Sequence, residues 1–292
     1  MKSLHKGDRL LNILKGHSLK QVQATVTKNE LISGIRRRSR GRVLLNSQLI
    51  WLNCPQIASE ASPGQFVMVG CGKECTLPRP FSIHQVNDEG DIALFFAVWE
   101  DGKGTNWLSR RQIGDTVNLL GPLGNGYSIQ SSSHNLLLLA GGIGIAPLYF
   151  LAQAALRRKC RVKLLHGAST ATHLYPKHLL PAKVELLTIT EDGTAGQKGM
   201  ITDFLPDFAG WADQVFACGP TGMHYDMALR KKELKLEGKP VQISLEVRMG
   251  CGLGVCYGCT VKTKNGLKQV CQDGPIFDLD DIIWDELIVV GV

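Results

Sequence analysis

Four cysteines near the C-terminal end of the chain have the types and spacing of an iron-sulfur ligand set. Cys251, Cys256, Cys259 and Cys271 follow the pattern C-x4-C-x2-C-x11-C. A 2Fe-2S cluster takes four thiolates, and three closely spaced cysteines followed by a distant fourth are typical of it. The pattern therefore predicts a 2Fe-2S cluster held by these residues.

Glycines alternate with the cysteines in this loop, at Gly250, Gly252, Gly254 and Gly258. Glycine reaches backbone conformations closed to other residues, so the loop can wrap a cluster and bring its amides close to the sulfides. A structural zinc site is the alternative, but zinc sites usually pair two short C-x2-C knuckles. A single run of three cysteines with one distant ligand favours the cluster.

A second candidate site begins at Arg79-Pro80-Phe81-Ser82, on an expected strand. An arginine can bind a pyrophosphate through two parallel hydrogen bonds, and a nearby serine hydroxyl can reach a flavin ring nitrogen. Arg-Pro at a strand edge also occurs for structural reasons alone. Gly104-Thr105 opens an expected helix, where free amides suit a phosphate and the threonine equally suits an ordinary N-cap.

Two further loops are candidates for binding a nucleotide. Gly141, Gly142 and Gly144 close one strand, and Pro147 opens a helix where the G-x-G-x-x-G fingerprint would have its last glycine. No acidic residue follows about twenty positions on to hold a ribose. Cys218-Gly219-Pro220 ends another strand, and ligands of parallel sheets bind at the carboxyl ends of strands. We interpret Cys218 as a small buried residue and not as a catalytic one.

The rhythm of apolar runs predicts a multidomain β plus α/β chain. Short apolar runs cut by turn residues from Gln21 to Leu120 indicate an antiparallel β-barrel. Alternating strands and helices after a polar linker at 131–135 indicate a Rossmann-like parallel sheet. The predicted division is 1–20, an N-terminal extension; 21–130, the barrel; 131–240, the nucleotide domain; and 241–292, a small cluster-binding lobe.

Composition narrows the class of protein. The chain has 292 residues, 44% of them apolar, which is enough for two compact cores. Nine cysteines without a secretory signal predict reduced thiols and a cytoplasmic location. The apolar stretch 136–156 carries glycines and a proline, so we expect a strand, turn and helix and no membrane span. The arginine run 36–42 could bind nucleic acid or an acidic face, but without interleaved aromatic residues a solvated loop is favoured.

In their order along the chain, these motifs and 63–66 (PGQF) resemble the ferredoxin-NADP reductase superfamily. The segments 246–259 and 270–277 are similar to one branch of it, the electron transfer subunits of dihydroorotate dehydrogenase B (NAD+). The resemblance covers about residues 21–288, and its cysteine segment is the most specific part.

The resemblance implies an FAD barrel, an NAD domain and a 2Fe-2S lobe that docks onto a separate FMN-containing dihydroorotate dehydrogenase catalytic subunit, as a heterotetramer of two of each. It implies electron transfer between NADH, FAD, the cluster and that FMN in pyrimidine biosynthesis. The chain would be a flavin and iron-sulfur oxidoreductase subunit with no catalytic acid, base or nucleophile of its own, and neither nucleic acid nor membrane among its partners. The implied FAD contacts are Arg79, Pro80, Phe81, Ser82, Phe95, Phe96, Ala97, Gly104 and Thr105. The implied NAD contacts are Gly141, Gly142, Gly144, Pro147, Cys218, Gly219 and Pro220.

Three departures from the family pattern and two alternatives stay open. Ala97 stands where the family often has an arginine, and the segment 35–48 resembles an insertion. Ser169 stands where the family often has an arginine after Gly-Ala, which leaves the preference for NADH or NADPH undecided. The nearest alternative is a related NAD(P)H-ferredoxin reductase, transhydrogenase or hydrogenase diaphorase-type subunit. A non-enzymatic iron-sulfur redox sensor is the other, but a sensor has no evident need for a flavin site and a nucleotide site.

Overall fold

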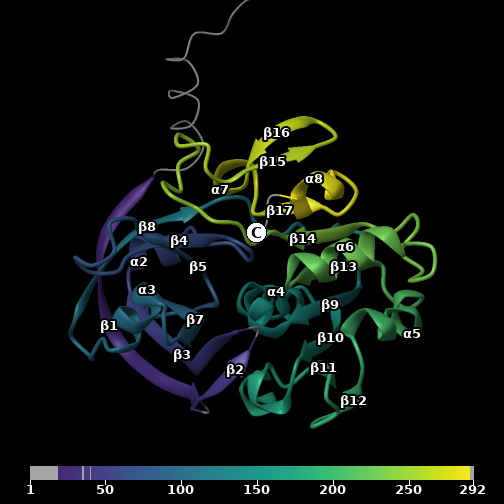
Figure 1. The fold of residues 1–292 in the computed structure, drawn as a ribbon, viewed down its shortest axis with the longest axis horizontal. Coiled ribbons are helices and arrows are strands. Elements are labelled where there is room, and N and C mark those ends of the chain that lie inside the picture. The colour runs from purple at the N-terminus through teal and green to yellow at the C-terminus, as the bar shows by residue number, and fades with distance from the viewer. Residues whose placement is uncertain (1–18, 35, 40, 290–292) are drawn as a thin grey trace, which may run out of the picture.

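The computed structural model describes residues 19–34, 36–39 and 41–289. A curved antiparallel sheet and a mainly parallel sheet lie side by side, and the C-terminal segment lies against both (Figure 1). The expected combination of a β-barrel with an α/β unit is confirmed. Of the predicted N-terminal extension, residues 1–18 lie outside the described part.

The first sheet, called the barrel sheet here, has the strand order β5-β4-β8-β1-β3-β7-β6, with β2 beside β3. Its paired strands are all antiparallel, and their inward side chains form a core that includes Ile50, Leu94 and Phe96. The strands are β1 Lys20–Ser33, β2 Arg37–Ser39, β3 Arg42–Asn53, β4 Phe66–Gly70, β5 Arg79–Ser82, β6 Gln85–Val86, β7 Asp91–Trp99 and β8 Thr116–Leu123, with helices α2 Pro55–Ala58 and α3 Lys103–Ser109.

The second sheet, called the nucleotide sheet here, has the order β12-β11-β10-β9-β13-β14-β17. Every pair in it is parallel except β14 with β17. The central strand β9 is buried on both faces, as its unbroken apolar run at 136–140 predicts. Its elements are β9 Asn135–Gly141, η1 Gly142–Gly144, α4 Ile145–Arg157, β10 Arg161–Ala168, η2 Ala171–His173, η3 Lys177–Leu179, β11 Val184–Thr190, β12 Gln197–Lys198, η4 Ile201–Phe204, α5 Leu205–Ala209, β13 Gln214–Cys218 and α6 Thr221–Leu229.

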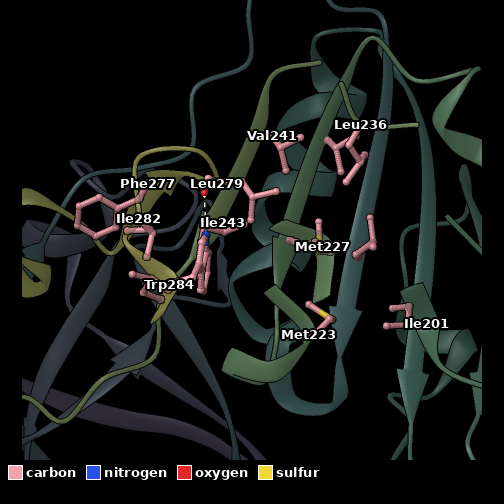
Figure 2. Close-up of a cluster of buried hydrophobic side chains, with 14 of the residues drawn as sticks. Ile201, Met223, Met227, Leu236, Val241, Ile243, Phe277, Leu279, Ile282 and Trp284 are labelled. Atoms are coloured by element: carbon pink, nitrogen blue, oxygen red, sulfur yellow. Dashed lines mark hydrogen bonds between the residues drawn. The ribbon is translucent and has the colours of Figure 1, made fainter. Parts of the chain in front are cut away.

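The segment after residue 240 belongs partly to this sheet. Strands β14 Val241–Ser244 and β17 Ile276–Asp278 extend it, while β15 Thr260–Thr263, β16 Gly266–Gln269, α7 Val270–Asp273 and α8 Trp284–Val289 form a lobe. One apolar cluster joins lobe and sheet, with Trp284 and Ile282 on one side and Met223 and Met227 on the other (Figure 2). The Trp284 indole Nε1 donates to the Leu279 carbonyl at 3.1 Å, so this core also satisfies its polar atom (Figure 2). The boundary at 240/241 stays a prediction.

The arginine run forms part of the β2–β3 hairpin. Arg36 pairs with Glu100, and Arg42 binds Asp101 through Nε and Nη2 and lies over the Trp99 ring at 4.7 Å. These exposed ion pairs hold the base of the hairpin on the barrel and favour the interpretation as a solvated structural element. In the described part of the chain, no helix is long and apolar enough to cross a membrane.

Candidate functional site

Strand β5 presents the predicted flavin motif at the edge of the barrel sheet. Arg79 pairs across the ladder with Val69 of β4, and Phe81 turns inward to meet Phe96 edge to face at 5.4 Å. The Arg79 guanidinium is exposed, donates to the Leu77 carbonyl at 3.0 Å, and forms no ion pair with a described carboxylate. An exposed cation on a rigid strand without a carboxylate partner is available to an anionic ligand.

Helix α3 begins directly beside Arg79. A Cβ on Gly104 would lie 3.0 Å from Arg79 Cγ and 3.4 Å from Cys71 Sγ, so the helix start packs closely against these two side chains. Thr105 Oγ1 donates to the Gly102 carbonyl at 3.1 Å. Because the helical hydrogen bonds begin at Asn106, the preceding amides are free to face an anion. The structure therefore brings Gly104 and Thr105 to Arg79, and Thr105 also has a structural role at the helix start.

The three candidates on β7 divide between the two faces of the sheet. Phe96 lies inside the barrel, whereas Phe95 and the half-buried Ala97 lie on the opposite face. The Phe95 ring packs against His84 and Tyr175, with centroid distances of 5.5 and 4.9 Å. The Phe95 side chain thus fills the contact between barrel and nucleotide sheet, and the assignment of this strand to FAD stays a prediction.

The two predicted nucleotide loops meet at the carboxyl edge of β9 and β13. A Cβ on Gly144 would come within 2.0 Å of the Cys218 carbonyl oxygen, and one on Gly141 within 2.8 Å of Pro220 Cδ. Gly142 has φ +54° and open space beside it. Pro147 lies buried in the first turn of α4. The absence of side chains at these glycines lets the two backbones touch and leaves one surface to which both contribute.

Cys218 is buried at the end of β13. Its thiol donates to Glu246 Oε1 at 3.7 Å, and the Tyr127 hydroxyl donates to the neighbouring Ala217 carbonyl at 3.3 Å. Burial, reinforced by the Glu246 carboxylate, raises the pKa of the Cys218 thiol. The thiol therefore stays protonated near neutral pH and is a poor nucleophile, in keeping with the prediction that it is not catalytic.

The cysteine loop directs backbone amides at its own sulfur atoms. Leu253 N–H points to Cys251 Sγ at 3.3 Å, and Gly254 N–H to Cys271 Sγ at 3.1 Å. Burial opposes ionisation of Cys251, but hydrogen bonds from the loop, the one from Leu253 among them, lower its pKa to about 7. Amides arranged around sulfur stabilise the thiolate form that a metal ligand must adopt.

Pairs of the four predicted ligand sulfurs lie within hydrogen-bond reach of each other. Cys251 hydrogen-bonds with Cys256, and Cys271 with Cys259, so the thiols fall into two pairs. In the part of the chain that the structure describes, no three or more His, Cys, Asp or Glu side chains are gathered as for a single ion. Four thiolates, two for each iron, are the donor set of a 2Fe-2S cluster, and the four cysteines can supply it.

The cysteine loop lies against the hairpin that carries the flavin motif. A Cβ on Gly252, which has φ +73°, would meet Met68 Cγ at 2.6 Å, and Met68 pairs across the ladder with Pro80. A Cβ on Gly250 would lie 4.0 Å from Leu77 Cδ1. The candidate cluster site and the candidate flavin site are therefore neighbours.

Several polar residues at these sites were not singled out from the sequence. Tyr127 and His84 lie in the contacts between the sheets, and each is a single residue outside any spaced motif. Glu246 begins the segment 246–259, but no role was predicted for its carboxylate, which binds Cys218. Ser169, which stands where an arginine often occurs, binds His173 Nδ1 through its hydroxyl at 2.8 Å.

The barrel, the glycine-rich nucleotide edge and the cysteine loop define a flavin-dependent, pyridine-nucleotide-linked reductase with an iron-sulfur centre. An oxidoreductase FAD-binding domain matches residues 44–127, an oxidoreductase NAD-binding domain matches 138–228, and the iron-sulfur cluster binding domain of dihydroorotate dehydrogenase B matches 246–283. A solved structure of the NADH-dependent reduced ferredoxin-NADP oxidoreductase, described for flavin-based electron bifurcation, is similar with a TM-score of 0.78 and 30% identity, over 94% of this chain and 93% of that one. A ferredoxin reductase of carbazole 1,9a-dioxygenase shares the fold, with a TM-score of 0.62 and 18% identity over 78% of this chain and 70% of that one.

The particular family is given by relatives of nearly full length. The chain is 36% identical to the dihydroorotate dehydrogenase B (NAD(+)) electron transfer subunit of Desulforamulus reducens, over 82% of this chain and 94% of that protein. It is 38% identical to the protein of the same name from Clostridium acetobutylicum, over 78% and 88%. The chain belongs to the family of dihydroorotate dehydrogenase B (NAD(+)) electron transfer subunits.

Proposed function

We propose that the chain passes electrons between NADH/NAD+ and the FMN of a dihydroorotate dehydrogenase catalytic subunit, through FAD and a 2Fe-2S cluster, in pyrimidine biosynthesis. The observation that carries the proposal is the position of β5. The cysteine loop touches the β4–β5 hairpin at Leu77 and Met68, and the nucleotide edge is hydrogen-bonded to the same segment through His84. A flavin exchanges a hydride with nicotinamide and single electrons with a cluster, so these three neighbouring sites suffice for the relay.

Each site has a defined part in this proposal. Arg79 and the start of α3 bind the FAD pyrophosphate, and Ser82 contacts the flavin ring. The loops at 141–147 and 218–220 bind the nucleotide. The four cysteines hold the cluster. Cys218 remains a protonated thiol and has no catalytic part in the proposal. The carbon chemistry belongs to the partner.

The rim of the cysteine loop is the proposed docking surface for the FMN subunit. Cys256 is exposed, and exposed apolar side chains lie on the cysteine loop or near it: Leu77, Val255, Tyr257 and Leu267 are 52, 54, 56 and 68% accessible. A groove of about 370 Å³ beside Cys259 continues this rim between the β15–β16 hairpin and α8. Apolar side chains gathered around a redox centre are typical of a surface that a partner covers. We propose a heterotetramer with two copies of each subunit.

Anaerobic titration tests the relay. Protein purified without oxygen should show flavin and iron-sulfur absorption, and NADH should bleach both bands. After co-expression with the cognate FMN subunit, the complex should couple dihydroorotate oxidation to NAD+ reduction. Bleaching of the flavin alone would remove the cluster from the path, and absence of flavin would refute the proposal.

A ferredoxin-linked reductase is the second candidate. The similarity to the NADH-dependent reduced ferredoxin-NADP oxidoreductase, at 30% identity over nearly the whole chain, favours this alternative. Turnover with reduced ferredoxin and none with dihydroorotate would select it. The nine cysteines are all unpaired, which supports the proposed cytoplasmic location for either function.

A further inference from the structure

His84 connects the two cofactor sites of the proposed relay. It lies two residues beyond Ser82, at the end of the flavin strand, and its side chain has no solvent exposure. The imidazole Nδ1 lies 2.9 Å from the Ala146 carbonyl, in the first turn of α4, and Nε2 lies 3.2 Å from the Tyr175 hydroxyl. A single side chain of the barrel thus binds two elements of the nucleotide sheet.

The hydrogen bonds fix the tautomer of this ring. A carbonyl oxygen only accepts, so Nδ1 carries the proton and donates to Ala146. Burial lowers the pKa of His84 to about 4, so the ring is neutral near pH 7 and Nε2 has a free lone pair. The Tyr175 hydroxyl therefore donates to Nε2. Each polar atom of the ring has one partner of the correct kind, and both partners lie outside the barrel.

Aromatic packing restrains the ring further. The rings of Tyr149, Phe95 and Tyr175 lie 4.5, 5.5 and 5.5 Å from that of His84. Tyr149 also donates to the Leu179 carbonyl at 3.1 Å, which ties α4 to the loop that carries Tyr175. The nucleotide elements that receive His84 are therefore connected to each other.

The contact lies beside both reactive centres of the proposed function. Ala146 directly precedes Pro147 in the turn that follows Gly144, and Ser82 and His84 are separated only by the fully buried Ile83. Hydride transfer requires the reacting atoms, the nicotinamide carbon that gives the hydride and the flavin nitrogen that takes it, at about 3 to 3.5 Å, and a misplacement of about 1 Å can cost about 100-fold in rate. A link between the two loops sets that distance.

We propose that His84 is a positioning residue for hydride transfer, which holds the nicotinamide site at a fixed distance from the flavin site through Ala146 and Tyr175. This inference rests on the proposed function. It predicts that loss of the link slows NADH-to-flavin transfer while both cofactors still bind. Electron flow from flavin to cluster does not cross the link and stays unchanged.

The test uses His84→Phe, which keeps an aromatic ring and removes both hydrogen bonds. Stopped-flow reduction of the full-length holoprotein by NADH should slow about 100-fold, with the NADH dissociation constant changed less than about threefold. The nicotinamide-flavin charge-transfer band should weaken. His84→Gln, whose amide can still donate to Ala146, should recover part of the rate, and Tyr175→Phe should cause a smaller loss.

His224→Phe is the matched control, because the His224 side chain is buried as well, at 1% exposed, and neither ring nitrogen has a hydrogen-bond partner among the described residues. It lies in α6 and faces Trp284 of the C-terminal lobe. The His224→Phe substitution should leave the reduction rate unchanged. Two results would overturn the positioning role and leave the proposed function standing. One is an unchanged reduction rate in His84→Phe. The other is a loss of NADH affinity as large as the loss of rate, found in both His84→Phe and His84→Gln. Wild-type protein that binds FAD but is not reduced by NADH would overturn the proposed function and this inference with it.

Discussion

Replacing Gly144 by alanine tests whether the two nucleotide loops form one surface. The added Cβ would lie 2.0 Å from the Cys218 carbonyl oxygen and 2.4 Å from its carbon, whereas ordinary contacts begin at 3.4 Å. The carbonyl would have to move by about 1.4 Å, and it belongs to the last residue of β13, which pairs with β9 and β14. Overpacking typically costs about 1 to 3 kcal/mol, and a backbone obstacle in a central strand places this case near about 3 kcal/mol.

Thermal unfolding and NADH titration measure the two consequences. A loss of about 3 kcal/mol lowers the melting temperature by about 6 to 12 °C in a unit of 150 to 250 residues. The NADH dissociation constant should rise at least about tenfold, since the displaced loop forms half of the binding surface. Flavin content should not change, because the proposed FAD pyrophosphate contacts, Arg79 and the start of α3, belong to the barrel and not to the edge formed by β9 and β13.

Two nearby glycines serve as controls. Gly222, in α6, has nothing within 4 Å of its missing Cβ, so Gly222→Ala should be neutral or stabilising by up to about 1 kcal/mol. Gly142 also has open space but a φ of +54°, so alanine there should cost about 1 to 2 kcal/mol through backbone strain alone. A Gly144→Ala protein that melts within 2 °C of wild type, by the same scale of about 2 to 4 °C per kcal/mol, would refute the reasoning.

Three further predictions concern the other sites. Cys256→Ser should lose the cluster and retain FAD, measured as iron content against flavin content; unchanged iron would show that the ligand set is wrong. Arg79→Ala should weaken FAD binding by about 10- to 100-fold, because a charge-assisted hydrogen bond contributes about 1.5 to 3 kcal/mol. Arg36→Ala, which removes another exposed arginine, is the control. Equal flavin retention in both variants would remove Arg79 from the site. Burial lowers the pKa of His84, His166 and His224 to about 4 each, so the unfolded chain binds more protons below its own histidine pKa, about 6.5. The contribution of these neutral histidines to the free energy of unfolding should therefore be fully present above about pH 6.5 and be lost as the pH falls towards 4. Urea unfolding at pH 7, 6 and 5 should show a smaller loss of stability with falling pH in His224→Phe than in wild type. An identical pH dependence would contradict the buried neutral state of His224.

Local patterns in the sequence were enough to predict elements whose burial shows in a short run of consecutive residues. The unbroken apolar run at 136–140 predicted β9 because a central parallel strand is buried on both faces. Gly141, Gly142 and Gly144 were predicted to bind a nucleotide, which stays a prediction, and the contact of Gly144 with the Cys218 backbone was not foreseen. The glycine-rich loop was expected to wrap a cluster and bring its amides close to the sulfides; the structure shows amides directed at the thiols of Cys251 and Cys271.

Pairings between distant segments could not be predicted in this way. β17 joins the nucleotide sheet from beyond the cysteine loop, and its pairing of Ile243 with Phe277 has no local signal. Phe95 was assigned to FAD by resemblance, but its side chain packs between the two sheets because β7 alternates and its outer face is covered by the nucleotide unit. His84 was not singled out, since it is one histidine between β5 and β6 that belongs to no spaced motif.

The two neighbours of the flavin strand are held by different kinds of interaction. On the cluster side, Gly252 packs on Met68, and Asn125 Nδ2 donates to the Asp273 carbonyl at 2.7 Å, so backbone contacts fix the lobe. On the nucleotide side, the polar link is a neutral imidazole. Leu77, which lies near Gly250 of the cysteine loop, and His84, which binds the nucleotide unit, are joined by a segment that spans at most about 23 Å in extended form. Both electron transfers can therefore occur at one rigid hairpin, and substitutions on its two sides should affect them separately.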